Sequence, residues 1–212
     1  MSLLALSPKA AALKEKLEKF VNERCIPAEK EYEDHINQFS GKDRWTLADV
    51  PPVVERLKRE AQGLGFWNLF LPHPVPDHLV GGDDDDGVPI TPSMYLSNRE
   101  YGILCEVMGR SGLAPDVCNC NAPDTGNMEV LLKHGTEEQQ STYLKSLLQG
   151  KIRSAFLMTE PDVASSDART LQTTLTKTIG VDGRVKYVLN GRKWWSTGAM
   201  DPRVSNCISC AV

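Results

Sequence analysis

Residues 156–167 read Phe156-Leu157-Met158-Thr159-Glu160-Pro161-Asp162-Val163-Ala164-Ser165-Ser166-Asp167. They follow a long helical region and open a run of predicted β-hairpins. About thirty residues later comes a second polar segment, which reads Asn190-Gly191-Arg192-Lys193-Trp194-Trp195-Ser196-Thr197-Gly198. Both segments are rich in hydroxyl groups and compatible with strands, and the second carries paired indoles. This combination predicts a flat aromatic ligand held against a small sheet.

Upstream of residue 153 the apolar residues recur at helical spacing. Ser7-Pro8 predicts the start of a first helix, which Pro27 is expected to bend or interrupt. A second helix is predicted to begin at Pro51-Pro52 and to end at Gly63 and Gly65. A third is predicted from Thr91-Pro92, with Tyr101, Leu104, Cys105 and Met108 on its buried side.

Residues 113–124 are predicted to be irregular. Beyond them, Met128, Leu131 and Leu132 indicate another helix. The series Thr136-Glu137-Glu138-Gln139 is a capping box at the start of the last one.

Downstream of residue 153 the pattern is that of strands. Polar and apolar residues alternate over 171–176, and Asp182-Gly183 and Asn190-Gly191 are both tight-turn signals. A further strand is predicted over 204–212. We therefore expect an α+β protein, with a helical domain at 1–152 and an incomplete antiparallel β-domain at 153–212.

The bulk composition excludes several classes of protein. A net charge of −4 over 212 residues does not favour binding to nucleic acid or to an anionic membrane. No apolar run approaches the ~20 residues of a membrane helix. The N-terminus lacks the basic start of a signal peptide, so an intracellular location is expected, without distinction between mitochondrion, peroxisome and cytosol.

No metal site is predicted. Cys207 and Cys210 have metal-ligand spacing, but no second pair completes a zinc site. All six cysteines are expected to be reduced and buried, because no secretion signal is recognised. The acidic run at 82–87 does not match a calcium-binding loop, because Gly82 stands at the first position, where a ligand side chain is required. We therefore expect a solvated loop. The four histidines show no ligand spacing.

Together, the Thr-Glu-Pro motif at 159–161 and the Asn-Gly-x-Lys-x-Trp motif at 190–195 resemble those of the acyl-CoA dehydrogenases. The sequence at 158–167 is most similar to that of the branch of family members ten and eleven. The resemblance covers nearly the whole chain and implies the N-terminal helical domain and part of the middle β-barrel domain. It also implies that a C-terminal four-helix bundle is missing and that the chain is a fragment, an abbreviated isoform or a truncated form.

The resemblance implies FAD as cofactor. The residues that match positions around the flavin are Phe156, Met158, Thr159, Ala164, Ser165, Ser166, Trp195 and Thr197. Ser165 also matches a residue that approaches the thioester ligand. Here Asp162, Val163 and Ala164 replace the family's Gly-Ala-Gly, which makes the backbone less free and the pocket smaller.

Residues 117–128 match the region that lines the acyl cavity. Asn119 and Asn121, with Asp124, make this region polar, so a hydroxylated acyl chain is a hypothesis. Trp194 and Trp195 are expected to face opposite ways if both lie in a strand, so that only one meets the flavin. Glu160 is read as a turn residue rather than as an acid or base.

The implied reaction is α,β-dehydrogenation of an acyl-CoA thioester, as in fatty-acid β-oxidation. The implied acceptor is an electron-transferring flavoprotein or a similar protein, and the complete protein would be a homo-oligomer, either a dimer or a tetramer. No catalytic base can be assigned, because in most of the family it lies in the C-terminal bundle, and little or no activity is expected of these 212 residues. Two alternatives remain open: a non-catalytic helical interaction module, and a flavoenzyme like the acyl-CoA or nitroalkane oxidases.

Overall fold

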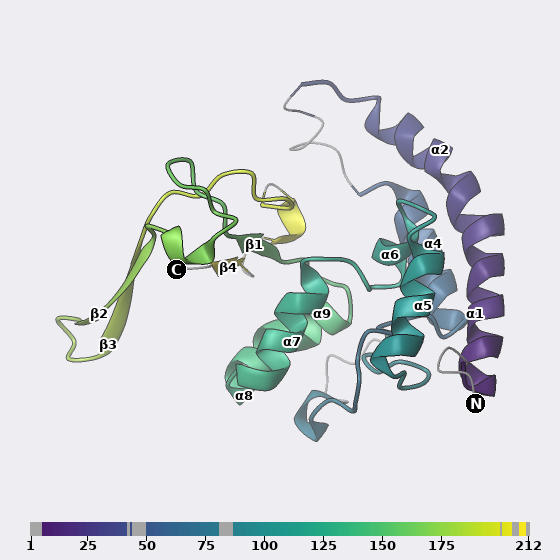
Figure 1. Cartoon of the computed structure of the whole chain (residues 1–212), viewed down its shortest axis with the longest axis horizontal. Helices are drawn as coiled ribbons and strands as arrows, with labels where there is room; N and C mark the ends of the chain where they lie inside the picture. Colours follow the sequence, from purple (N-terminus) through teal and green to yellow (C-terminus); the bar gives the residue numbers. More distant parts are fainter. Residues whose placement is uncertain are drawn as a thin grey trace. The chain divides into compact units, whose positions relative to one another are not determined.

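The computed structural model describes residues 6–41, 43, 50–80, 87–199, 201–204 and 208–210. The chain divides into two compact units, Met1–Ile152 and Arg153–Val212 (Figure 1). The first unit is helical, and the second holds all the described strands. Each unit is considered by itself below.

The first unit begins with a long, gently curved helical segment (Figure 1). It consists of α1 (Pro8–Phe20), a π-helical turn η1 (Val21–Cys25) and α2 (Ile26–Ile36). Ser7 caps α1 as predicted, with its hydroxyl accepting from Ala10 N at 3.3 Å. The change expected at Pro27 takes the form of the π-helical turn immediately before it, which separates α1 from α2 without ending the helical run. The wider π turn ends at Ile26, whose N–H bonds the Val21 carbonyl five residues back, so the helix continues through the proline.

Of the next two helices, the first starts where the sequence predicts and the second starts later. Helix α4 (Pro52–Gly63) starts at the predicted proline pair and ends at the first of the two predicted glycine stops. A 3₁₀ turn η2 (Asp77–Leu79) follows. Helix α5 (Asn98–Met108) starts later than the predicted Thr91-Pro92. Ser97 is its cap and forms a capping box with Glu100, a stronger start signal than a Thr-Pro pair.

The first unit closes with a series of short helices. They are α6 (Ala114–Val117), α7 (Asp124–His134), α8 (Glu137–Gln139), a π-helical turn η3 (Gln140–Leu144) and α9 (Lys145–Leu148). The capping box of Thr136 and Gln139 is confirmed. The largest fully buried side chains of this unit are Trp67, Phe66, Leu17, Leu57, Leu69, Leu71, Leu79, Leu104, Met108, Met128, Leu144 and Leu147.

The cysteines are only partly as expected. Cys25, Cys118 and Cys120 are free and buried, whereas Cys105 on α5 is free and exposed. Burial raises the pKa of the Cys25 and Cys120 thiols to about 12, so both stay protonated and unreactive at neutral pH. Cys207 and the acidic residues 82–86 lie outside the described part of the chain. None of the described helices is both long enough and apolar enough to span a bilayer.

The second unit contains two small sheets. Strand β1 (Ala155–Leu157) pairs with β4 (Ile208–Cys210), and β2 (Thr174–Ile179) pairs with β3 (Val185–Asn190). The β2–β3 pair is antiparallel, but β1 and β4 are parallel, which differs from the expected wholly antiparallel arrangement. Short 3₁₀ turns lie at Ala168–Thr170 (η4) and Pro202–Val204 (η5).

The two turn signals had different outcomes. Asp182-Gly183 forms the turn between β2 and β3, with Gly183 at φ +75°. Asn190-Gly191 is not a hairpin turn, because β3 ends there and the chain runs on past Thr173. A Cβ on Gly191 would overlap the Thr173 side chain, so only glycine permits this close approach.

Candidate functional site

The Thr-Glu-Pro and Asn-Gly-x-Lys-x-Trp segments lie against each other in the second unit. Trp194 N donates to the Thr159 carbonyl at 3.0 Å, and Lys193 Nζ donates to the Met158 carbonyl at 3.0 Å. Two segments more than thirty residues apart in sequence therefore form one local site.

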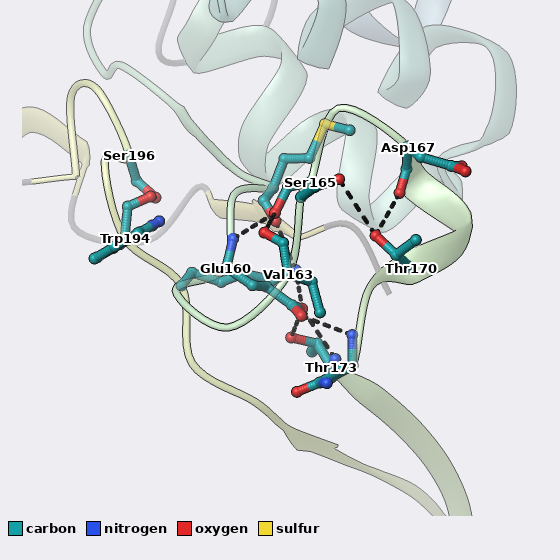
Figure 2. Close-up of polar contacts among 12 residues, drawn as sticks. Glu160, Val163, Ser165, Asp167, Thr170, Thr173, Trp194 and Ser196 are labelled. Atoms are coloured by element: carbon teal, nitrogen blue, oxygen red, sulfur yellow. Dashed lines mark hydrogen bonds and ion pairs between the residues drawn. The ribbon is translucent and has the colours of Figure 1, made fainter.

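Glu160 is the centre of the polar contacts in this site (Figure 2). Its carboxylate accepts from Lys193 Nζ at 2.8 Å, from the backbone N–H groups of Gln172 at 2.6 Å and Thr173 at 2.9 Å, and from the Thr173 hydroxyl. The side chains of Glu160 and Lys193 are 4% and 6% exposed. The Lys193 ammonium, then the Thr173 hydroxyl and the Gln172 N–H, lower the Glu160 pKa to about 2.

Sequence reasoning missed this role of Glu160. The sequence predicts a turn residue, whereas in the structure its buried carboxylate joins three segments. Neither Glu160 nor Lys193 carries a local pattern that signals the other, since they are 33 positions apart. Only the presence of both residues in the two recognised motifs could have suggested their contact.

The loop after Pro161 is held by its own hydroxyl groups. Ser165 is buried, and its Oγ accepts from Glu160 N at 2.8 Å. Thr170 Oγ1 donates to the carbonyls of Asp167 at 2.8 Å and Ala164 at 3.3 Å (Figure 2). The Ser165 hydroxyl, predicted to meet cofactor and substrate, thus has a structural partner, whereas Ala164 and Ser166 are exposed.

The two tryptophans do not face opposite ways. Their ring centroids are 5.3 Å apart with an interplanar angle of 46°, so the indoles pack on each other. The expected alternation fails because neither residue lies in a described strand and Trp195 has a left-handed φ of +53°. Trp195 is 79% exposed and Trp194 44%, so the pair presents a broad aromatic surface.

The remaining predicted flavin residues lie in the same unit. Phe156 is exposed on β1, Met158 and Thr159 are half-buried, and Thr197 is exposed just beyond the tryptophan pair. Among the described residues, no hydrogen-bond partner is found for the Thr159, Ser166 or Thr197 hydroxyls, so these groups remain available to a ligand.

Asn119 belongs to the interior of the first unit. Its Nδ2 donates to Asn68 Oδ1 at 2.7 Å and to the carbonyls of Leu147 and Leu148 at 2.9 and 3.3 Å. These bonds give Asn119 a structural role, and its assignment to the acyl chain stays a prediction that no described contact supports. Asn121, by contrast, is half-buried, and Asp124 is buried at the start of α7.

The described residues contain no group of three His, Cys, Asp or Glu side chains placed to hold a metal ion. The arrangement offers an exposed aromatic surface and hydroxyl groups, which suit recognition of an organic ligand. Its central carboxylate cannot serve as a general base, because it is buried and already accepts four hydrogen bonds.

Comparison with known proteins identifies the relatives of this chain, although no family model matches it. Mouse (Mus musculus) acyl-CoA dehydrogenase family member 10 is 43% identical over 204 residues, which is 96% of this chain and 17% of that protein. A Mycobacterium abscessus structure assigned as an acyl-CoA dehydrogenase is 43% identical, with a TM-score of 0.74 over 94% of this chain and 45% of that one.

A third similar protein is the acyl-CoA dehydrogenase from Bacillus anthracis solved in complex with FAD. It is 25% identical, with a TM-score of 0.53 over 94% of this chain and 28% of that one. The chain thus spans less than half the length of each of these proteins. Its high identity to relatives over almost all of its own residues confirms the resemblance read from the two motifs. The chain belongs to the acyl-CoA dehydrogenase family.

Proposed function

We propose that this chain contributes part of the FAD site of an acyl-CoA dehydrogenase. One observation carries the proposal: the Thr159 and Trp194 segments are joined by a backbone hydrogen bond, which brings the predicted flavin residues together. The FAD complex of the Bacillus anthracis relative supports the choice of cofactor.

The residues present fit a flat aromatic ring. Trp195 is largely exposed although tryptophan is usually much more buried, and it is held in a left-handed backbone conformation. Such local strain often accompanies a binding site. An exposed indole offers a face for stacking, and the Thr159 and Thr197 hydroxyls offer hydrogen bonds to the polar edge of a flavin.

The proposed reaction is α,β-dehydrogenation of an acyl-CoA thioester. When bound, FAD supplies the acceptor for the hydride that leaves the β-carbon, while a base removes the α-proton. The residues of this chain would orient the ring: Trp195 by packing, and Met158 and Thr159 through their backbone and hydroxyl groups. We propose that the full-length enzyme supplies the base and passes its electrons to an electron-transferring flavoprotein. We also propose that it assembles as a dimer or a tetramer.

Titration with FAD tests the cofactor proposal. We expect the purified chain to quench flavin fluorescence and Trp195→Ala to weaken binding about tenfold, the loss of one stacking contact. Tyr187→Ala, which removes an exposed aromatic ring from the hairpin, is the control and should bind as the parent does. Absence of saturable FAD binding by the parent chain would contradict the proposal.

Measurement of turnover tests the proposed reaction. We expect little or no dye reduction with acyl-CoA by the 212-residue chain, because Glu160, the central carboxylate of the site, is buried and already accepts four hydrogen bonds. The hydroxyacyl hypothesis now depends on Asn121. It requires that a complete enzyme prefer 4-hydroxyacyl-CoA and lose this preference in Asn121→Ala; equal turnover of plain and hydroxylated substrates would end it.

A further inference from the structure

The Glu160–Lys193 ion pair differs from the neighbouring pair in its burial. Both of its side chains are nearly closed to solvent, at 4% and 6% exposure. Arg192 and Asp162 form the adjacent pair at 3.1 Å, but their side chains are 72% and 64% exposed. Two ion pairs one residue apart on one segment thus have opposite environments.

The buried pair joins several backbone segments. Lys193 Nζ bonds both the Glu160 carboxylate and the Met158 carbonyl. The carboxylate also receives the N–H groups of Gln172 and Thr173 at the entry to β2, while Glu160 N donates to Ser165 Oγ. Removing either charge would therefore loosen the contact between the 158–160 and 193–194 segments.

Stability alone is a poor explanation for this arrangement. Removing two charges from water costs free energy that their attraction often fails to recover, so apolar residues would frequently serve as well. A buried pair is better suited to fixing one register, since each charge tolerates few alternative partners. Here the register that it fixes is the one that places Trp194 N on the Thr159 carbonyl.

We infer that Glu160 and Lys193 are positioning residues, whose buried ion pair holds the tryptophan pair in place against the Met158–Thr159 backbone. This inference rests on the proposed flavin site for its functional meaning. Neither charged group is placed to touch the ligand, because both are enclosed by protein. The pair acts on FAD through the segments that it aligns.

The test compares Lys193→Met and Glu160→Gln with the matched control Arg192→Met in the 212-residue chain. Two measurements are made on each variant: the Kd for FAD, and the exciton signal in circular dichroism that two indoles in close contact produce. We expect both variants of the buried pair to raise the Kd by about 10- to 100-fold and to lose most of the exciton signal. Arg192→Met should change neither.

Thr173→Val provides a milder variant that leaves both charges in place and removes only the hydroxyl donor to Glu160. We expect a smaller change in the same direction, with the helical signal and the amide protection of β2 and β3 unchanged. Loss of hairpin protection in both Thr173→Val and Lys193→Met would overturn the inference, because the pair would then maintain the whole unit rather than the site.

The two proposals fail in different ways. If the parent chain shows the exciton signal but binds no FAD, the proposed function is wrong, while the Lys193→Met signal still decides whether the pair positions the tryptophans. If the parent binds FAD and folded Lys193→Met retains both its affinity and the exciton signal, the positioning role is wrong and the proposed function stands.

Discussion

The buried Asn119 side chain forms hydrogen bonds within the first unit. The residue has a positive φ of +52° and is buried, and its amide bonds Asn68 and two carbonyls at the end of α9. Asparagine tolerates this backbone conformation better than most residues do. The same residue type that suggested a polar substrate cavity thus closes a turn inside the first unit.

Replacing Asn119 tests this structural role. We expect Asn119→Ala to lower the free energy of unfolding by about 2–3 kcal/mol, because buried acceptors lose their donor and alanine is strained at positive φ. Asn119→Gly loses the same bonds without the strain and should be less damaging. Urea unfolding measures both, with half-buried Asn121→Ala as control, expected within about 0.5 kcal/mol of the parent. Equal stability of the parent and Asn119→Ala would contradict this account.

At the scale of the element, α5 depends on its first turn. The Ser97 hydroxyl accepts from Glu100 N, and the Glu100 carboxylate accepts from Ser97 N at 3.0 Å and Ser97 Oγ at 2.8 Å. Contacts to Ser7 and Ser97 lower the Glu100 pKa to about 2. The capping box therefore works through an ionised carboxylate.

This helix cap should depend on pH. Because the folded pKa lies below the unfolded value of about 4.3, the Glu100 carboxylate stabilises the fold above about pH 4, and its contribution is lost as the pH falls towards 2. We expect Glu100→Gln to cost no more than about 1 kcal/mol at pH 7, and less at pH 3. Unfolding at both pH values, with Glu106→Gln as control on the same helix, checks this. A penalty that grows on acidification would refute it.

The β2–β3 hairpin has two unlike faces. Directly paired residues share a face, so Leu175 with Leu189 and Ile179 with Val185 lie on the side of Tyr187. All five of these side chains are more than half exposed. The opposite face carries mainly Thr174, Thr176, Thr178, Lys186 and Asn190.

This apolar face should bind a hydrophobic dye. We expect the chain to enhance the fluorescence of anilinonaphthalene sulfonate, and the double variant Leu175→Thr, Leu189→Thr to reduce that signal at least twofold, because threonine keeps the strand propensity but removes apolar area. Val188→Thr on the other face is the control. An unchanged signal in the double variant would place the dye elsewhere.

At the scale of the whole molecule, the two units are held together internally by different forces. The buried apolar side chains lie almost all in the first unit; in the described part of the second they are Ala155 and Val204. The second unit has instead the backbone ladder of β2 and β3 and the local hydrogen bonds of the site around Glu160. Since burial of apolar area is the dominant stabilising term, the first unit should be the more stable.

Hydrogen exchange tests this difference. We expect the amides of β2 and β3 to exchange at least roughly tenfold faster than those of α5, because the hairpin opens locally without exposing a core. Exchange measured by mass spectrometry, after correction for intrinsic rates, gives the comparison. Equal protection of the hairpin and α5 would show that the second unit has a stabilising contribution that its described contacts do not reveal.

Much of the local structure was readable from the sequence. The helical period before residue 153, the Ser7 and Thr136 caps and the Asp182-Gly183 turn all depend on neighbours within a few positions. Two local signals gave wrong predictions. Thr91-Pro92 predicted the start of α5, which the Ser97–Glu100 capping box sets instead. Asn190-Gly191 predicted a hairpin turn, but Gly191 lies against Thr173 at the end of β3.

By itself the sequence determined the helical first unit, the strand pairing at Asp182-Gly183 and, through two motifs, the family. Only the tertiary structure decided that Glu160 pairs with Lys193, that the Trp194 and Trp195 rings touch, and that Asn119 is buried. The physical reason is distance along the chain. A cap or turn is stabilised by adjacent residues, whereas a buried charge acquires its partner only when remote segments fold together and exclude water.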